Sequence, residues 1–363
     1  MGSIRTLLAI SVVFAHTYGY IFVGGQTAVQ LFYIISGYLI SYILIEAKSY
    51  PEILAFYKNR FLRLFPTYWT VAFITFSLYA LASFFLKKPA GPLETFSLLD
   101  PVGKIALAVT NITLLGQDWI MFTGVRDGTF EFVGNFRLSD IEVYTGLLAP
   151  QAWTLGVELT FYIIAPFILP RRKILFILLF LSLSLRLYFF KIGIIFQDPW
   201  SYRFFPTELS FFILGALSHQ YLAPWYNKKN FITARNSNTF TTIIFICCAG
   251  LFLAPHKNIA TLLLLAIFII TLPFLFHFNS QKAWDKNIGE LSYPIYISHM
   301  LVVMIFNKLY KTIGLPERTL TYSLIIIITT TIFSLIINNY IGKFVEKRRH
   351  KIKNTQSFLA PLK

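Results

Sequence analysis

The fold of this chain follows from a short stretch near its start, Arg5-Thr6-Leu7-Leu8-Ala9-Ile10-Ser11-Val12-Val13-Phe14-Ala15-His16. Eleven helical residues rise by about 16 Å, roughly half of a hydrocarbon core about 30 Å thick. If Arg5 lies at one membrane face, His16 therefore lies near the middle of the bilayer. An imidazole at that depth is costly unless it faces a polar cavity, which makes His16 a candidate functional residue. The alternative is a histidine that only packs against a neighbouring helix.

The composition of the whole chain agrees with a membrane setting. Of 363 residues, 56% are hydrophobic and 13% are charged, whereas about 25% of a soluble domain is charged. Long apolar runs cover the chain without an internal repeat, so we expect an all-α polytopic membrane helix bundle. The net charge of +16 does not indicate nucleic-acid binding, because the basic residues lie in short segments between apolar runs, as orientation signals do.

Apolar runs of about 17–23 residues predict ten transmembrane helices. They cover approximately residues 7–23, 27–45, 68–86, 151–169, 174–190, 205–222, 240–254, 259–278, 293–310 and 320–341. We expect a polar, basic loop over Lys48–Pro66. The long stretch 87–150 holds one more apolar run, Lys104–Gly116, which is short for a crossing and suits a re-entrant or interfacial helix.

The distribution of basic residues predicts the orientation. If Lys104–Gly116 does not cross, 20 of the 32 basic residues lie on the side of Arg5 and both termini. The stretch 87–150, on the other side, holds five basic and seven acidic residues. The positive-inside rule then favours cytoplasmic termini and an extracytoplasmic 87–150 stretch. We expect a membrane domain over 1–342 and a basic cytoplasmic tail over 343–363.

Three groups of polar residues could carry chemistry. Arg60 and Arg63 share a helix face and suit phosphate groups, although anchoring beside anionic lipid headgroups is the simpler interpretation. An acid inside a predicted span, Glu158, must face the bundle interior with a partner, and Glu208 poses the same question. Tyr296 and His299 share a face near a helix start.

Metal binding and hydrolase chemistry lack sequence support. No two histidines have i, i+4 spacing, and the adjacent Cys247 and Cys248 point to different sides of a helix, so we expect neither a metal site nor a disulfide. No nucleophile elbow is present. The chain also has no phosphate-binding glycine loop.

These stretches, in order and spacing, resemble the acyltransferase 3 family of integral membrane acyltransferases. The matching patterns are Arg5-x10-His16; Gly24-Gly25 leading to Ser36-Gly37-Tyr38-Leu39; Arg60-x-x-Arg63-Leu64-Phe65-Pro66; Trp153-Thr154-Leu155-x-x-Glu158-x-x-Phe161-Tyr162; and Ser292-Tyr293-x-x-Tyr296-x-x-His299. The resemblance covers nearly the whole chain. The chain departs from the pattern at Ala28, where glycine is common, and at Gln30, where an acidic residue is common, and both departures concern the polar network around His16.

The resemblance implies an O-acyltransferase of the bacterial inner membrane. It would move an acyl group, most often acetyl, from cytoplasmic acetyl-CoA to a hydroxyl of a carrier- or lipid-linked glycan outside, such as lipopolysaccharide O-antigen. No permanently bound cofactor is implied; the partners are acyl-CoA, the glycan acceptor and membrane lipids.

The resemblance also implies roles for individual residues. Arg5, Arg60 and Arg63 would bind the donor, and neutral His16 would act as general base or form an acyl-histidine. Glu158 would orient an acceptor hydroxyl or the His16 ring. The stretch 87–150 would select the acceptor. The remaining polar candidates form an acceptor or structural network: Trp153, Thr154, Tyr162, Ser36, Glu208, Tyr296 and His299.

A second interpretation comes from a different class. His16, Glu158 and Glu208 could instead serve as a proton relay in a transporter or flippase for a sugar or glycolipid. The lack of an internal repeat disfavours this alternative.

Overall fold

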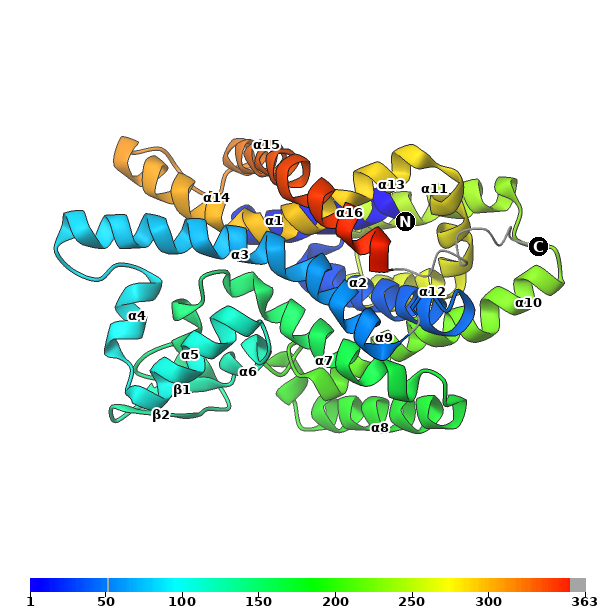
Figure 1. Ribbon diagram of the computed structural model, residues 1–363, viewed down its shortest axis with the longest axis horizontal. Coiled ribbons are helices and arrows are strands. Elements are labelled where there is room, and N and C mark those ends of the chain that lie inside the picture. Colours follow the sequence, from blue (N-terminus) through cyan, green and yellow to red (C-terminus); the bar gives the residue numbers. More distant parts are fainter. Residues whose placement is uncertain (51, 353–363) are drawn as a thin grey trace.

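The computed structural model describes residues 1–50 and 52–352 of the chain, which form a bundle of long helices with a smaller helical and β region at one end (Figure 1). The α-helices are α1 Gly2–Thr17, α2 Gly24–Ser41, α3 Ile53–Leu86, α4 Pro92–Leu98, α5 Pro101–Thr113, α6 Gln117–Ile120, α7 Trp153–Ile168, α8 Arg172–Lys191, α9 Phe205–Leu217, α10 Ala223–Lys228, α11 Ala234–Gly250, α12 Lys257–Gln281, α13 Ala283–Glu290, α14 Ser292–Ile313, α15 Leu320–Ile337 and α16 Lys343–Ile352. The strands are β1 Thr123–Arg126 and β2 Thr129–Phe132. Short 3₁₀ or π segments are η1 Tyr42–Glu46, η2 Phe136–Leu138, η3 Val143–Gly146, η4 Pro150–Ala152, η5 Ile194–Phe196, η6 Ser218–Leu222, η7 Leu251–Leu253 and η8 Asn338–Gly342.

Helices occupy all ten segments that the sequence predicts as spans. Within the described residues, eight helical segments are long and apolar enough to cross a membrane. The other two predicted spans contain shorter helices, α1 with 16 residues and α9 with 13. The helical membrane bundle is therefore confirmed, whereas ten crossings and the side of the termini remain predictions.

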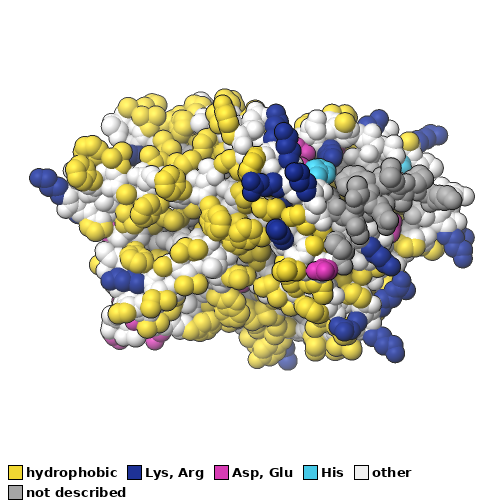
Figure 2. All heavy atoms as spheres, viewed as in Figure 1, with side chains coloured by type: hydrophobic (Ala, Val, Ile, Leu, Met, Phe, Trp, Pro, Cys, Tyr) yellow, Lys and Arg dark blue, Asp and Glu magenta, His cyan; other side chains and the backbone are white. Residues whose placement is uncertain are grey.

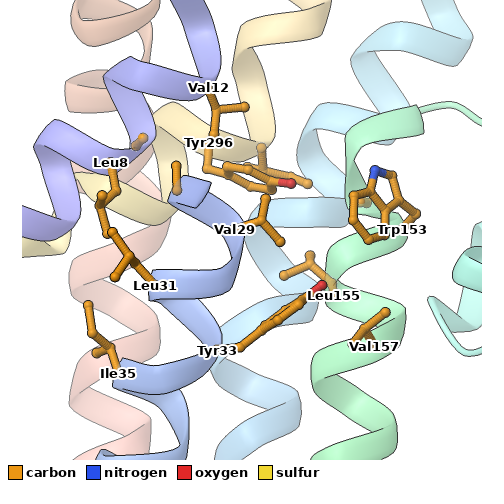
Figure 3. Close-up of a cluster of buried hydrophobic side chains, with 14 of the residues drawn as sticks. Leu8, Val12, Val29, Leu31, Tyr33, Ile35, Trp153, Leu155, Val157 and Tyr296 are labelled. Atoms are coloured by element: carbon orange, nitrogen blue, oxygen red, sulfur yellow. The ribbon is translucent and has the colours of Figure 1, made fainter. Parts of the chain in front are cut away.

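Helix α1 lies inside the bundle, where it packs against α2, α13, α14 and α15. Its Leu8 and Val12 join a buried cluster with side chains of α2, α7 and α14 (Figure 3). Asp285 of α13 accepts hydrogen bonds from the backbone N–H groups of Gly2 and Ser3, each at 2.8 Å, and so caps the start of α1. Protein covers most of α1, whereas Ala15 and His16 at its C-terminal end are exposed within the bundle.

The expected loop over Lys48–Pro66 is wrong for most of its length. Helix α3 begins at Ile53 and runs without a break through Arg60, Arg63 and Pro66 to Leu86. The polar composition of this segment marks the membrane edge rather than the end of the helix. As a result, Arg60 and Arg63 lie on a rigid helix and point into the protein.

The expectation of an all-α fold is wrong for part of the stretch 87–150. Strands β1 and β2 form an antiparallel hairpin in which Arg126 pairs with Thr129. The turn is Asp127-Gly128, and both residues have positive φ angles, 49° and 75°. An Asp-Gly pair between β-forming residues is a strong hairpin signal, so this element was visible in the sequence.

The short apolar run forms α5, with Asp100 capping its start and Pro101 in its first turn. At its C-terminal end, the backbone carbonyls of Asn111 and Ile112 accept hydrogen bonds from Tyr68 and Trp69 of α3. Tyr68 lies eight residues beyond Arg60 on α3, a rise of about 12 Å. The structure therefore places α5 against the middle of α3, while its re-entrant or interfacial character remains a prediction.

Helices α2 and α9 approach closely through two glycines. A Cβ at Gly37 would collide with the backbone of Phe212, and a Cβ at Gly215 would collide with the carbonyl of Ile34. Small residues that bring backbones together are a common way of packing helices in membranes. This contact fixes α2, and with it Ser36, against the rest of the bundle.

We predict that Gly37→Ala destabilises the protein, because the added methyl group meets backbone atoms that cannot rotate away; overpacking of this kind costs about 1–3 kcal/mol. Thermal unfolding in detergent should show a lower midpoint than wild type. Gly250→Ala is the matched control, because a Cβ there meets no atom within 4 Å. Equal midpoints for the two variants would contradict the close helix contact.

Candidate active site

A narrow cavity of about 80 Å³ lies between α1, α2, α3, α7 and α14. We call it the arginine cavity because Arg5, Arg60 and Arg63 all line it. The other lining residues are Val29, Phe32, Tyr33, Ile35, Ser36, Leu39, Ile40, Leu64, Thr154, Leu155, Glu158, Tyr162, Ser292, Tyr293 and Tyr296. The cavity therefore brings together residues from all five of the sequence patterns.

The three arginines share the cavity with one acidic side chain, Glu158. None of them forms an ion pair with a carboxylate of the residues described. Arg60 is 2% exposed, and its Nη2 donates to Asn59 and Tyr50 while Nε and Nη1 have no partner. Arg5 and Arg63 lie close enough for their charges to repel each other. Burying like charges without a counterion is expensive, so this arrangement favours binding of an anion.

Glu158 lies on the opposite wall of the arginine cavity. It accepts hydrogen bonds from Ser36, at 2.7 Å, and from the hydroxyl of Tyr162. No hydrogen bond or ion pair between Glu158 and His16 occurs among the described residues, so direct orientation of the His16 ring by Glu158 remains a prediction. Its predicted role toward an acceptor hydroxyl is not tested by these contacts.

A larger chamber of about 490 Å³ adjoins the arginine cavity and shares Arg5, Leu39, Arg63 and Tyr293 with it. We call this chamber the basic vestibule. Its remaining wall consists of Met1, Gly2, Thr67, Asn279, Lys286, Gly289, Glu290, Pro294, Asn338, Gly342, Lys343, Val345, Glu346, Lys347, Arg349 and His350. Figure 2 shows basic side chains gathered over the position that α16 has in Figure 1. The arginine cavity thus opens toward the end of the bundle that holds the N-terminus and α16.

His16 lies at the far end of α1 from Arg5, beside His299 of α14. Their ring centroids are 5.2 Å apart. His299 is buried, and its Nδ1 lies 2.6 Å from the carbonyl oxygen of Tyr296. Because a carbonyl only accepts, Nδ1 carries the hydrogen, and the neutral ring presents a lone pair at Nε2. That Nε2 atom has no hydrogen-bond partner among the described residues. It can therefore accept a proton, or a hydrogen bond from a hydroxyl group.

Tyr296 separates the arginine cavity from the histidine pair. Its ring lines the cavity and lies 5.9 Å from the ring of His299. Its hydroxyl group is bound by Thr154, at 2.8 Å, and by the carbonyl of Gln151, at 2.9 Å. Figure 3 shows Tyr296 extending from α14 toward α7, above Val29 and Leu155. This side chain therefore lies between the arginine cavity and His299.

Trp153 is buried beneath the guanidinium group of Arg203, a residue that the sequence did not single out. Arg203 lies 4.4 Å from the Trp153 ring centroid and binds Asp198 through two hydrogen bonds of 2.5 and 3.0 Å. Burial lowers the pKa of Arg203, but Tyr202 and Asp198 raise it by more, so its pKa lies above the ordinary value. Burial also raises the pKa of Tyr202. Arg203 is therefore a fixed positive charge beside Trp153.

Glu208 has a structural partner rather than a place in either cavity. It is fully buried and pairs with Arg186 of α8 at 2.5 Å. Arg186 lies inside a predicted span, where a basic residue needs an internal partner, so this pair could have been found in the sequence. The ion pair accounts for Glu208 without a catalytic role.

The structure thus divides the predicted residues into an anion-binding half and a histidine half, with Tyr296 and Thr154 between them. The site therefore lies inside a bundle whose long apolar helices are those of a membrane protein. A family model described as an acyltransferase domain matches residues 2–339. The chain belongs to this family, acyltransferase 3, and is a membrane acyltransferase; the resemblance of its motifs is confirmed.

One relative from another organism is similar over part of the chain. An uncharacterized protein of Aquifex aeolicus is 25% identical over 209 residues, which are 56% of this chain and 90% of that protein. No solved structure matches the chain significantly.

Proposed function

We propose that the protein transfers an acyl group, most simply acetyl, from cytoplasmic acyl-CoA to a hydroxyl of an extracytoplasmic glycan or glycolipid, such as lipopolysaccharide O-antigen, in the bacterial inner membrane. The observation that carries this proposal is the set of three arginines, with one carboxylate, in a cavity that adjoins the basic vestibule and is lined by Tyr296, whose ring lies 5.9 Å from that of His299. CoA supplies the missing negative charge as phosphates, which guanidinium groups bind through paired hydrogen bonds.

The donor would enter from the vestibule with its thioester leading. Its diphosphate would remain near Arg5 and Arg63, and its pantetheine arm would follow the arginine cavity. The cavity is narrow and closed by Tyr296, so loading includes rotation of this side chain toward the membrane interior. The thioester carbonyl would then lie beside the histidine pair.

Transfer would use His16 as general base. Its neutral imidazole takes the proton of the acceptor hydroxyl while the oxygen attacks the thioester carbonyl. The carbon–sulfur bond then breaks, and the CoA thiolate receives the proton. The lone pair of His299 Nε2 would accept a hydrogen bond from a second, neighbouring hydroxyl of the acceptor and so hold the acceptor beside His16. In the covalent variant, His16 takes the acyl group first and the acceptor removes it.

The acceptor would approach from the stretch 87–150. A groove of about 380 Å³ lies there between α3, α4 and α14, and it begins at Met300, directly after His299. Its wall combines apolar side chains, including Leu301 and Met304, with Glu94 and Thr145. This mixture suits a glycan carried on a lipid.

The proposal predicts that purified wild-type protein moves label from [¹⁴C]acetyl-CoA to a membrane glycan extract and slowly hydrolyses acetyl-CoA without acceptor. Chromatography of glycans and released CoA measures both reactions. Acid quenching before acceptor is added distinguishes an acyl-histidine from direct transfer. Protein that neither binds nor consumes any acyl-CoA would contradict the proposal.

A further inference from the structure

The wall of the basic vestibule contains more basic than acidic side chains. Lys286 of α13 and Lys343 and Lys347 of α16 line it, and no ion pair of the described residues involves any of the three lysines. Of its two acidic side chains, Glu346 is bound by Arg349. Exposed lysines close together repel one another unless an anion lies between them.

Helix α16 is a fixed wall of the vestibule. Asn59 of α3 donates to the carbonyl of Arg349 at 3.3 Å, and the Asn59 side-chain oxygen accepts from the Arg349 guanidinium, also at 3.3 Å. The same oxygen accepts from Arg60 at 2.8 Å. Val345 is buried against the bundle. Asn59 therefore connects α16 directly to an arginine of the arginine cavity.

The two chambers differ in the kind of cation that they offer. The neck shared by both holds two guanidinium groups, Arg5 and Arg63, which suit the paired oxygens of a diphosphate. The far wall holds ammonium groups, which act as compact point charges and suit an isolated phosphate. A volume of about 490 Å³ lies within the usual 300–1,000 Å³ range of small-molecule sites.

We propose that Lys286 and Lys347 form a subsite for the phosphomonoester on the nucleotide end of the donor, the 3′-phosphate of CoA. This inference rests on the proposed function. It adds a binding site for the part of the donor that would lie outside the arginine cavity. The subsite would lie between α13 and α16. Because α16 belongs to the segment that we expected to be a cytoplasmic tail, part of that segment would bind the substrate directly. The protein would thereby distinguish CoA thioesters from otherwise similar thioesters without that phosphate.

The test compares CoA with 3′-dephospho-CoA by isothermal titration calorimetry, using the full chain in a neutral detergent. Neither compound carries an acyl group, so no turnover occurs. We expect wild type to bind CoA about tenfold more tightly, the effect of one or two charge-assisted contacts at an accessible site. Lys286→Gln/Lys347→Gln should bind both compounds with the wild-type affinity for dephospho-CoA. Arg63→Gln should weaken both compounds by the same factor.

The matched control is Lys282→Gln/Lys351→Gln, which removes the same charge from α16 and the residue before α13 but from side chains that do not line the vestibule. It should keep the wild-type preference. Persistence of the preference in Lys286→Gln/Lys347→Gln, or equal loss in the control, would overturn the subsite. Equal wild-type binding of CoA and dephospho-CoA would also overturn it and leave the proposed function intact. Wild type that binds neither compound would instead contradict the donor assigned under the proposed function.

Anionic lipid headgroups offer the same phosphate chemistry, so a second arm repeats the titration in phosphatidylcholine nanodiscs with and without phosphatidylglycerol. We expect the same preference for CoA in both. Loss of the preference when phosphatidylglycerol is present would assign the lysines to lipid headgroups and overturn the proposal.

Discussion

His16→Ala is expected to abolish acyl transfer while leaving donor binding almost unchanged. General-base catalysis contributes about 10²–10⁴-fold to a rate, so transfer should fall by that factor. Donor affinity should persist because His16 and Arg5 are at opposite ends of α1, and neither cavity with arginines includes His16. Labelled transfer and CoA titration on the same preparation measure the two effects separately.

The control for this variant is His277→Ala, which removes a histidine near the end of α12. His277 contacts Ser237 at 3.0 Å and lies on α12, away from the α1–α14 pair. It should transfer at the wild-type rate. His299→Ala should lose transfer by a smaller factor than His16→Ala, because its Nε2 positions the acceptor without taking the proton. A stably inserted His16→Ala protein with full transfer would exclude both the base and the acyl-histidine mechanisms.

The sequence predicts the helices well and their contacts poorly. Hydropathy located each long helix because the bilayer core imposes its thickness on apolar runs. It failed at Ile53, where α3 begins, since a helix continues past the membrane edge without any change that hydropathy can detect. It also gave no indication that Gly37 and Gly215 bring two backbones together, which depends on the pairing of α2 with α9.

In the candidate site, too, the sequence predicts positions along the helices better than the contacts between them. The spacing between Arg5 and His16 correctly indicated two ends of one helix, and the structure adds the cavity that begins at Arg5. The resemblance implied that Glu158 orients an acceptor hydroxyl or the His16 ring, and the structure adds that Glu158 is hydrogen-bonded to Ser36 and Tyr162 in the cavity that the arginines line. The sequence did not single out Arg203, because only the structure shows its contact with Trp153.

Arg5→Met is expected to weaken donor binding and, at the same time, to preserve or raise the stability of the ligand-free protein. Hydrogen bonds to charged groups are worth about 1.5–3 kcal/mol, so CoA affinity should fall about tenfold to hundredfold. Arg5 has no carboxylate ion pair in the described structure and shares its cavity with two other arginines and one acid, Glu158, so methionine of similar length removes a charge that is only partly compensated. Replacing such charges by apolar side chains is often neutral or stabilising.

Arg186→Met provides the opposite case in the same bundle. Arg186 pairs with the fully buried Glu208 at 2.5 Å, and breaking a buried pair from one side costs about 3–5 kcal/mol. Its unfolding midpoint should therefore fall well below wild type, whereas that of Arg5→Met should not. Saturating CoA should raise the midpoint of wild type more than that of Arg5→Met, because only a ligand that binds the folded state stabilises it. If Arg5→Met unfolds as early as Arg186→Met, the Arg5 charge is compensated within the protein, and the arginine cavity has no need of an anionic ligand.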